Sequence, residues 1–455
     1  MKSIKTIMLG AVVALGLAGA AQATTKTFYI AGSSAFRSQA HTSIMHLLGS
    51  TDYDASAGTG TISSGTLAAE GYNYGYACSD SANLGKSSNS LFIGNIATIG
   101  DVIIHCTWTG SESGLYAVAI DSGTGANVSF ITDTATTALA GQHSTSASVT
   151  HVPDAAMSDT YQSSSQWFGG ATVVYSNSTS HIVSTLTEAT DSPVGVTYFQ
   201  FGVTKSGSAD GITNITSEQA KYLYTNGVGS VPVNYFVPSY TGTTAKVYGA
   251  GRDPDSGTRL SVFGEIGLGL LGHTSQYYVY DSGTNILQGA GTISFIKPVP
   301  ATTVNNVTVN LGDSGYASGG NLVKAINSEA GDQVSTAPFK LNTATGSAAP
   351  IGSCLICYAG VSDMTSLTNG QKLTFNGVAA LDANVQNGTY PLWTYEHMYL
   401  SPNISSDASL VGNKIANQLR NNDAGGTGCV SRGSMKVKRT SGSKDGGATI
   451  QTGVF

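Results

Sequence analysis

The chain has 455 residues, of which 11% are charged, and a formal net charge of −6. The acidic balance argues against a nucleic-acid binder, because phosphate contacts need a basic field. Apolar and aromatic runs recur throughout, which argues against disorder, and the length allows two or three domains with substantial cores.

Residues 1–23 have the pattern of a secretory signal peptide. Two lysines precede an apolar run over residues 7–18, and a small-residue cleavage site ends at Ala23. No later stretch has the roughly 20 apolar residues of a membrane helix. We expect cleavage after Ala23 and a mature periplasmic or secreted chain without a membrane span.

Five cysteines bear on the compartment and on metal binding. In an oxidising compartment they permit two disulfides and one free thiol, but the sequence does not set the pairing. Cys354 and Cys357 have the spacing of a redox or metal pair, yet lie in an apolar run without a second pair or a His cluster. We therefore predict no metal and no cofactor. The cysteines are Cys78, Cys106, Cys354, Cys357 and Cys429.

The first part of the chain alternates apolar strands with turns rich in Ser, Gly or Asp. A helix is expected after the first turn and ends near Gly49, and residues 50–100 are expected to form an insertion of loops and short strands. The expected strands cover residues 26–31, 101–108 and 152–157, and the turns that follow them cover 32–36, 109–114 and 158–160.

In the middle of the chain, residues 193–205 form a long β-branched run that predicts a buried strand crossing between lobes. Thr216 and Gln219 have capping-box spacing at the start of a helix. Residues 245–250 predict another strand, followed by a turn and a helix that starts at Ser256 or Thr258.

The last part of the chain continues the alternation of strands and helices. Hairpins are expected over residues 273–318, and helices begin near Gly319 and Leu410. The basic cluster at 436–439 predicts a solvated face without a function. Alternating strands and helices indicate α/β sheets, whose ligands bind where strands end and helices begin. The late strands are expected at 354–361 and 390–400.

The turn after residues 245–250 has the chemistry of an anion site. A helix that starts at Ser256-Gly257-Thr258 offers unpaired N–H groups, two hydroxyls and the positive end of the macrodipole. Arg252 adds a charge whose fork fits a tetrahedral oxyanion. The same residues also suit an ordinary capped turn in which Arg252 pairs with Asp253 or Asp255.

Together these motifs resemble the periplasmic phosphate-binding receptors of bacterial phosphate ABC importers, which have the type II periplasmic binding fold. The Arg-x-x-x-Ser-Gly-Thr motif of that family matches Arg252 with Ser256-Gly257-Thr258. Its other turns are similar to residues 32–36, 110–114 and 158–159, in the same order.

The resemblance implies a two-lobed α/β fold with β-rich insertions. Lobe 1 would comprise residues 24–195 and 391–455, and lobe 2 residues 196–390 with a hairpin insertion around 273–318. The implied partners are inorganic phosphate and an inner-membrane ABC permease, with no enzymatic activity. Asp159 would accept a proton of the ligand and so favour phosphate over sulfate. The implied phosphate-binding residues are Ser33, Ser34, Ala35, Phe36, Ser111, Ser113, Asp159, Arg252, Ser256, Gly257 and Thr258.

Two positions depart from the family, and two other functions stay open. Ala35 stands where the family has a hydroxyl, and Pro254 stands where it has the Asp that orients the Arg. Low charge and abundant Gly and Thr also fit an exported surface or filament protein built on the same fold. Asp-Ser-Gly loops at 121–123 and 281–283 resemble those of aspartic proteases, a more distant alternative.

Overall fold

The computed structural model describes most of the chain after the leader. The predicted leader and the two Asp-Ser-Gly loops at 121–123 and 281–283 lie outside the described residues. The described residues are 24–67, 70–79, 83–120, 127–133, 142–143, 148–189, 193–204, 211–225, 227–228, 230–242, 245–280, 285–288, 295–327, 340–341, 347–348, 353–440, 446–448 and 450–453.

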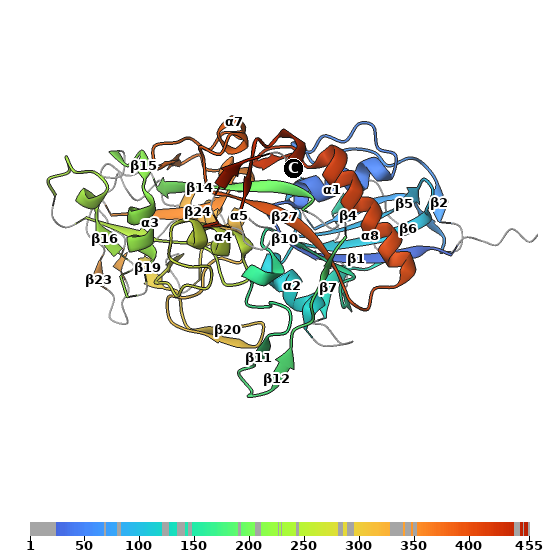
Figure 1. The fold of residues 1–455 in the computed structure, drawn as a ribbon, viewed down its shortest axis with the longest axis horizontal. Helices are drawn as coiled ribbons and strands as arrows, with labels where there is room; N and C mark the ends of the chain where they lie inside the picture. The colour runs from blue at the N-terminus through green and yellow to red at the C-terminus, as the bar shows by residue number, and fades with distance from the viewer. Residues whose placement is uncertain are drawn as a thin grey trace, which may run out of the picture.

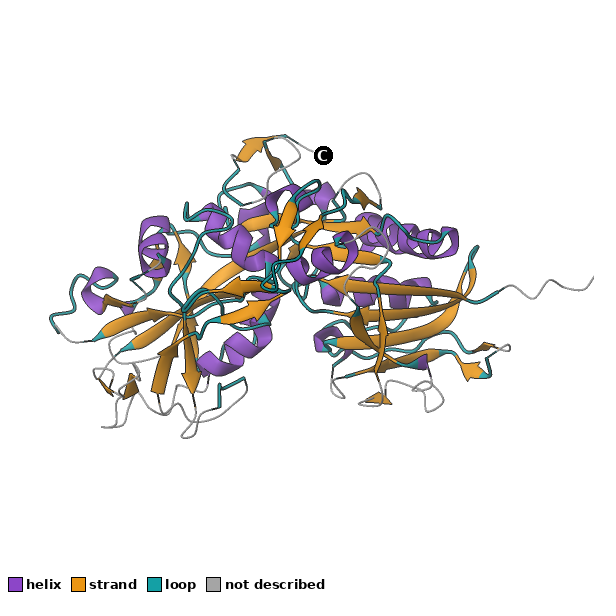
Figure 2. Ribbon diagram, turned by 90° about the horizontal axis from the view of Figure 1, so that it is seen from below, coloured by secondary structure: helices purple, strands orange, loops and turns teal. Residues whose placement is uncertain are grey.

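The chain has the two-lobed α/β architecture that the resemblance implied (Figures 1 and 2). One sheet runs through both lobes in the order β16-β17-β24-β14-β27-β10-β1-β6-β5-β4-β8. Its two central strands, β14 (Gly195–Thr204) and β27 (Trp393–Leu400), pair antiparallel and join the lobes. Because β14 and β27 each run through both lobes, the sheet has no break that marks a lobe boundary. The boundaries at residues 195 and 391 therefore stay predictions.

The first lobe is built on parallel pairs of β1 with β6 and β10. β27 lies antiparallel to β10 on one side, and β5 lies antiparallel to β6 on the other. Its larger elements are β1 (Lys26–Gly32), α1 (Arg37–Leu47), β4 (Gly75–Cys78), β5 (Asn89–Ile96), β6 (Gly100–Thr107), α2 (Ser111–Ala119), β10 (Ala155–Ser158) and α8 (Ser406–Gln418).

The second lobe repeats this plan on a smaller scale. β17 pairs parallel with β24, and β14 pairs antiparallel with β24. Its larger elements are α3 (Ser217–Tyr224), β16 (Ser230–Pro232), β17 (Lys246–Gly249), α4 (Gly257–Glu265), α5 (Gly319–Asn327), β24 (Cys354–Gly360), α6 (Val361–Met364) and α7 (Asp382–Gln386).

Shorter strands form hairpins and edge pairs around this frame. They are β2 (Thr66–Leu67), β3 (Tyr72–Asn73), β7 (Val128–Ile131), β8 (Gln142–His143), β9 (Ser148–His151), β11 (Thr172–Val174), β12 (Ser180–Ile182), β13 (Thr187–Glu188), β15 (Asn214–Ile215), β18 (Tyr277–Tyr280), β19 (Phe295–Pro298), β20 (Thr302–Val304), β21 (Val307–Val309), β22 (Lys340–Leu341), β23 (Ser347–Ala348), β25 (Gly370–Lys372), β26 (Thr374–Phe375), β28 (Cys429–Val430), β29 (Val437–Arg439) and β30 (Ile450–Thr452).

Several short helical turns complete the set. The 3-10 turns and one π-helical turn are η1 (Leu84–Lys86), η3 (Gln162–Ser164), η5 (Val233–Tyr235), η7 (Leu419–Asp423) and η8 (Arg432–Ser434). Among the described residues, no helix is both long and apolar enough to span a membrane.

Local sequence patterns placed most of these elements correctly. Thr216 and Gln219 form the predicted capping box at α3, and Ser256, rather than Thr258, caps α4. Residues 50–100 differ from the prediction, because they include β5, an eight-residue strand of the main sheet. The side chains of β5 are mostly buried. The sequence around β5 is rich in Gly, Ser and Tyr, and no helical or strand period distinguishes the strand from these residues.

The basic cluster at 436–439 also differs from the prediction. Arg439 is 4% exposed, its guanidinium lies 4.4 Å from the ring centre of Trp393, and it pairs with Glu265 at 3.1 Å. The solvated-face interpretation is therefore wrong for Arg439, which fastens the C-terminal segment to the second lobe. Contacts of the Trp393 ring and of the aliphatic part of the Arg439 side chain account for the burial of Arg439.

The cysteines contribute to the cores rather than to cross-links. All five are described, all five are buried, and none of them forms a disulfide within the described residues. Cys78, Cys106 and Cys429 pack in the core of the first lobe, whereas Cys354 and Cys357 lie on β24.

Candidate functional site

Hydroxyl groups from both lobes meet at the carboxylate of Asp159, directly after β10. The Ser111 hydroxyl, at the start of α2, donates to Oδ1 over 2.5 Å. The Thr258 hydroxyl, at the start of α4, donates to Oδ2 over 3.1 Å. All three residues are buried, and these bonds connect positions 48 and 99 residues apart.

The start of α4 lies directly against this carboxylate. A Cβ atom on Gly257 would lie 1.7 Å from Asp159 Oδ1, so only glycine fits this approach. The Ser256 hydroxyl accepts from the N–H of Arg259. Among the described residues we find no acceptor for the N–H groups of Gly257 and Thr258, which are the free donors of a helix N-terminus.

The start of α2 touches the second lobe through its backbone. The N–H of Glu112 donates to the carbonyl of Asp255 over 3.0 Å. Gly110, with φ 111°, precedes the helix, and a Cβ there would lie 2.5 Å from the same carbonyl oxygen. The two lobes are therefore in direct contact beside Asp159. Ser113 also belongs to α2, but no hydrogen bond joins it to these described residues.

The turn after β1 reaches the same region from a different side. The N–H of Ser33 donates to the carbonyl of Met157 over 2.8 Å, and its hydroxyl donates to Oε2 of Glu396 over 3.3 Å. Ser34 and Ala35 are buried in the turn, and Phe36 packs in the core of the first lobe. The Phe36 side chain is thus structural, which leaves only its backbone available to a ligand.

Arg252 is held by main-chain groups of the insertion rather than by an acid. Its Nε donates to the carbonyl of Tyr316 over 3.1 Å, and its Nη2 donates to the carbonyl of Ala317 over 2.9 Å. No hydrogen bond joins it to Ser111, Asp159 or Thr258 within the described residues. Among the residues that the structure describes, no ion pair joins Arg252 to a carboxylate, and Arg252 is 2% exposed.

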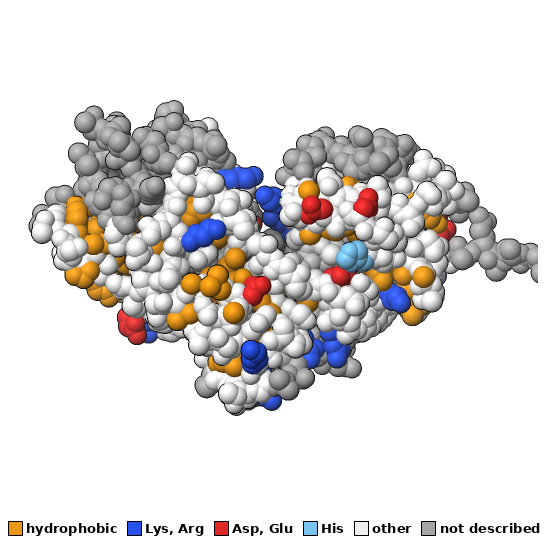
Figure 3. Space-filling model, turned by 90° about the horizontal axis from the view of Figure 1, so that it is seen from above, with side chains coloured by type: hydrophobic (Ala, Val, Ile, Leu, Met, Phe, Trp, Pro, Cys, Tyr) orange, Lys and Arg blue, Asp and Glu red, His pale blue; other side chains and the backbone are white. Residues whose placement is uncertain are grey.

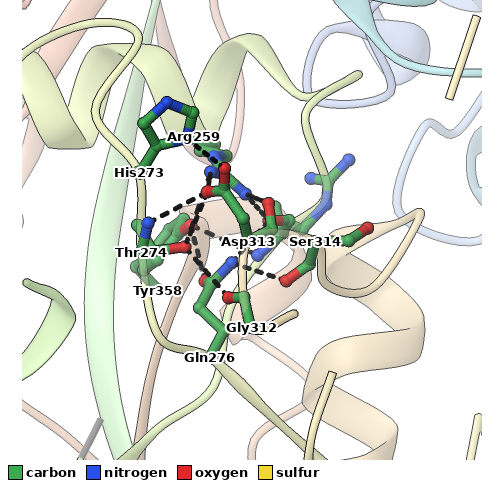
Figure 4. Close-up of polar contacts among 9 residues, drawn as sticks. Arg259, His273, Thr274, Gln276, Gly312, Asp313, Ser314 and Tyr358 are labelled. Atoms are coloured by element: carbon green, nitrogen blue, oxygen red, sulfur yellow. Dashed lines mark hydrogen bonds and ion pairs between the residues drawn. The ribbon is translucent and has the colours of Figure 1, made fainter. Parts of the chain in front are cut away.

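A polar network fixes the loop that holds Arg252 (Figure 4). Arg259 on α4 pairs with Asp313 at 2.6 Å and donates to the carbonyl of Arg252 over 3.2 Å. Asp313 also accepts from His273 and from the N–H of Thr274. The network therefore ties α4, the Arg252 backbone and the 312–317 loop into one unit.

Two acids beside Arg252 have perturbed ionisation. Burial raises the pKa of Asp253, and the charges of Arg252 and Arg259 only partly oppose it. Burial, then the nearby charges of Asp253 and Glu112, raise the pKa of Asp255 well above its ordinary value. The side chain of Asp255 accepts from Asn305. Both shifts act in the direction of the neutral carboxyl group.

The hairpin of β20 and β21 spans from the second lobe to the first (Figure 1). The Asn306 side chain donates to the Tyr116 hydroxyl over 2.9 Å, and the N–H of Ser176 donates to the Asn306 carbonyl over 2.7 Å. Asn305 and Asn306 both have positive φ, which a tight hairpin turn favours. The hairpin therefore joins the lobes next to the Asp159 site.

Figure 3 shows a notch between the two lobes, with Lys or Arg side chains at its wall. Within the described residues, no group of three or more His, Cys, Asp or Glu side chains is arranged to hold a metal ion.

The structure adds functional candidates that sequence reasoning missed. Glu396 is a charged residue within the apolar strand β27, yet it is fully buried there and accepts a hydrogen bond from Ser33. Tyr316 and Ala317 act through carbonyl groups, which leave no mark in a sequence. A charge inside an otherwise apolar strand was the available signal for Glu396.

Comparisons with known proteins give a distant structural similarity. No protein-family model matches the chain, and no curated protein matches its sequence. A protein from Clostridium perfringens, described as a phosphate ABC transporter substrate-binding protein and solved with bound phosphate, is 10% identical. The match covers 89% of this chain and 99% of that one, with a TM-score of 0.38.

Two further solved structures are similar over comparable lengths. An ABC-type phosphate transport receptor from Vibrio cholerae is 11% identical, with 86% of this chain and 93% of that chain covered and a TM-score of 0.37. PstS from Borrelia burgdorferi is 10% identical, with 87% and 93% covered and a TM-score of 0.31. At such low scores the similarity is general, and what the site can bind follows from its own residues.

Proposed function

We propose that the protein is an extracytoplasmic receptor that captures inorganic phosphate between its lobes. A further part of the proposal is that it delivers phosphate to an ABC-type importer of the inner membrane. The observation that supports this most is the meeting of Ser111, Thr258 and Asp159 at the N-terminal ends of α2 and α4.

The chemistry of binding follows from the donors and acceptors of the site. The N–H groups of Gly257 and Thr258 and the positive end of the α4 dipole attract an anion. The hydroxyls of Ser111 and Thr258 turn from Asp159 to the ligand oxygens. Asp159 then accepts a proton of the ligand, which phosphate carries at neutral pH and sulfate lacks.

The hydrogen bonds of these groups are sufficient for micromolar binding of phosphate. Hydrogen bonds to charged groups contribute roughly 1.5–3 kcal/mol each, and micromolar binding needs only about 8 kcal/mol. A hydroxyl in place of Ala35 is therefore not required.

Equilibrium dialysis of the mature chain against labelled phosphate tests this function. We expect saturable binding that excess sulfate does not displace. Absence of binding at millimolar phosphate would contradict the proposal.

A structural role in an exported surface or filament protein is the second candidate. It is favoured by the direct hydrogen bonds between the lobes, namely Glu112 to Asp255 and Asn306 to Tyr116. A chain that binds no phosphate and assembles into filaments or coats would support this candidate.

A further inference from the structure

The β20–β21 hairpin crosses from the second lobe to the first and ends in a tight two-residue turn. Val304 pairs with Val307, so Asn305 and Asn306 alone form the turn, with φ of 47° and 63°. Both values lie in the left-handed region that a type I′ hairpin turn requires and that asparagine tolerates better than most residues. The turn therefore presents the side chain and the carbonyl of Asn306 in defined directions.

The first lobe has polar and apolar partners for this turn. The Asn306 side chain donates to the Tyr116 hydroxyl over 2.9 Å, and the Asn306 carbonyl accepts from the N–H of Ser176 over 2.7 Å. Val307 packs against the apolar cluster of the first lobe that contains Tyr116. The Tyr116 ring packs in turn on Trp167, with 4.8 Å between ring centres. The tip of the hairpin is thus bound to the first lobe by three neighbouring contacts.

The other end of the hairpin is continuous with the loop that holds Arg252. The N–H of Gln276 donates to the carbonyl of Gly312 over 2.7 Å, which fixes the base of the hairpin to the second lobe. Four residues later, the carbonyl of Tyr316 accepts from Arg252 Nε over 3.1 Å. One short segment, residues 306–316, therefore contacts the first lobe at one end and the guanidinium at the other.

We propose that the β20–β21 hairpin is a latch that holds the two lobes together and limits their opening. Its contacts with the first lobe are made by groups of the chain alone, so they stabilise the closed arrangement whatever the site binds. Each such hydrogen bond shifts the balance between closed and open lobes by roughly threefold to tenfold. A ligand held between lobes leaves when they part, and the latch therefore slows its release.

The amide of Glu112 reports separation of the lobes at a contact that Asn306 does not make. Its N–H donates to the carbonyl of Asp255 across the two lobes over 3.0 Å. Hydrogen exchange at this amide requires that bond to break, so it becomes faster when the lobes part more often. The measurement needs no ligand.

The experiment compares the wild-type chain with Asn306→Gly and with the control Asn376→Gly, all without phosphate. Glycine suits a turn with positive φ, so Asn306→Gly keeps the turn and removes the side chain that bonds Tyr116. Asn376 also has positive φ, at 51°, but its side chain bonds Ser217 within the second lobe. We expect exchange at the Glu112 amide to be about threefold to tenfold faster in Asn306→Gly and unchanged in the control.

Tyr116→Phe removes the acceptor of the same hydrogen bond and is the second variant. Combining it with Asn306→Gly should accelerate exchange little beyond the larger of the two single effects. Equal exchange at the Glu112 amide in wild type and Asn306→Gly would overturn the inference, as would fully additive effects in the double variant. An unprotected Glu112 amide in the wild type would overturn it as well, because the lobes would then part freely.

The latch and the proposed function fail by different results. A wild-type chain that binds no phosphate in equilibrium dialysis would overturn the proposed function, and the exchange at the Glu112 amide would still decide the latch. Where phosphate does bind, Asn306→Gly should also release it about threefold to tenfold faster than the control Asn376→Gly.

Discussion

The two halves of the candidate site differ in the kind of group they present. The first lobe presents carboxylate acceptors, Asp159 and Glu396, which are bonded to hydroxyls. The second lobe presents the N–H groups at the start of α4, which have no acceptor among the described residues, and we propose that Arg252 adds its guanidinium to these donors. A ligand that satisfies both halves must accept and donate hydrogen bonds, which a partly protonated oxyanion does.

The halves also differ in what holds them in place. In the first lobe, the loops follow adjacent strands β1, β6 and β10, so the sheet itself positions Ser33, Ser111 and Asp159. In the second lobe, Arg252 depends on the insertion, whose carbonyl groups at Tyr316 and Ala317 bind its guanidinium. The donor half is thus built from a longer and less regular segment.

Asp313→Ala should produce the largest effect, because it removes the support of the donor half. Arg259 would stay buried without its counterion, which typically costs about 3–5 kcal/mol of stability. Urea unfolding measures this loss, and phosphate binding should weaken with it as Arg252 shifts. The exposed Asp407 at the start of α8 is the control, and its replacement by Ala should cost less than about 1 kcal/mol. Equal losses would show that other contacts hold the loop.

Arg252→Ala removes the positive charge of the donor half. Losing charge-assisted bonds of roughly 1.5–3 kcal/mol each should weaken phosphate binding about a hundredfold or more. Circular dichroism should still show a folded chain, although two carbonyl groups lose their donor. Tight binding by this variant in equilibrium dialysis would place the anion site elsewhere.

Asp159→Asn changes the acceptor half without changing its size. An amide can donate to an oxyanion that has no proton. The affinity for sulfate relative to that for phosphate should therefore rise about tenfold, or about 1.4 kcal/mol. Competition dialysis with both anions measures the ratio. A ratio equal to that of the wild type would remove the selectivity role of Asp159.

Local patterns in the sequence were sufficient for the elements that carry the site. The long run at 193–205 forms the crossing strand β14, and Ser256 caps α4 by its own hydroxyl. The turn that ends in Asp159 follows a short strand, as expected. Each of these features depends on residues a few positions apart, so their periodicity and capping chemistry can be read directly.

Only the tertiary structure decided how these elements meet. Arg252 binds the carbonyl groups of residues 64 and 65 positions away, and Ser33 binds Glu396, 363 positions away. Arg439 is buried against Trp393, whereas the basic cluster at 436–439 predicted a solvated face. Contacts of this kind form between side chains and main-chain groups brought together by the sheet order. No local period encodes them, because their energy depends on burial and on distant partners.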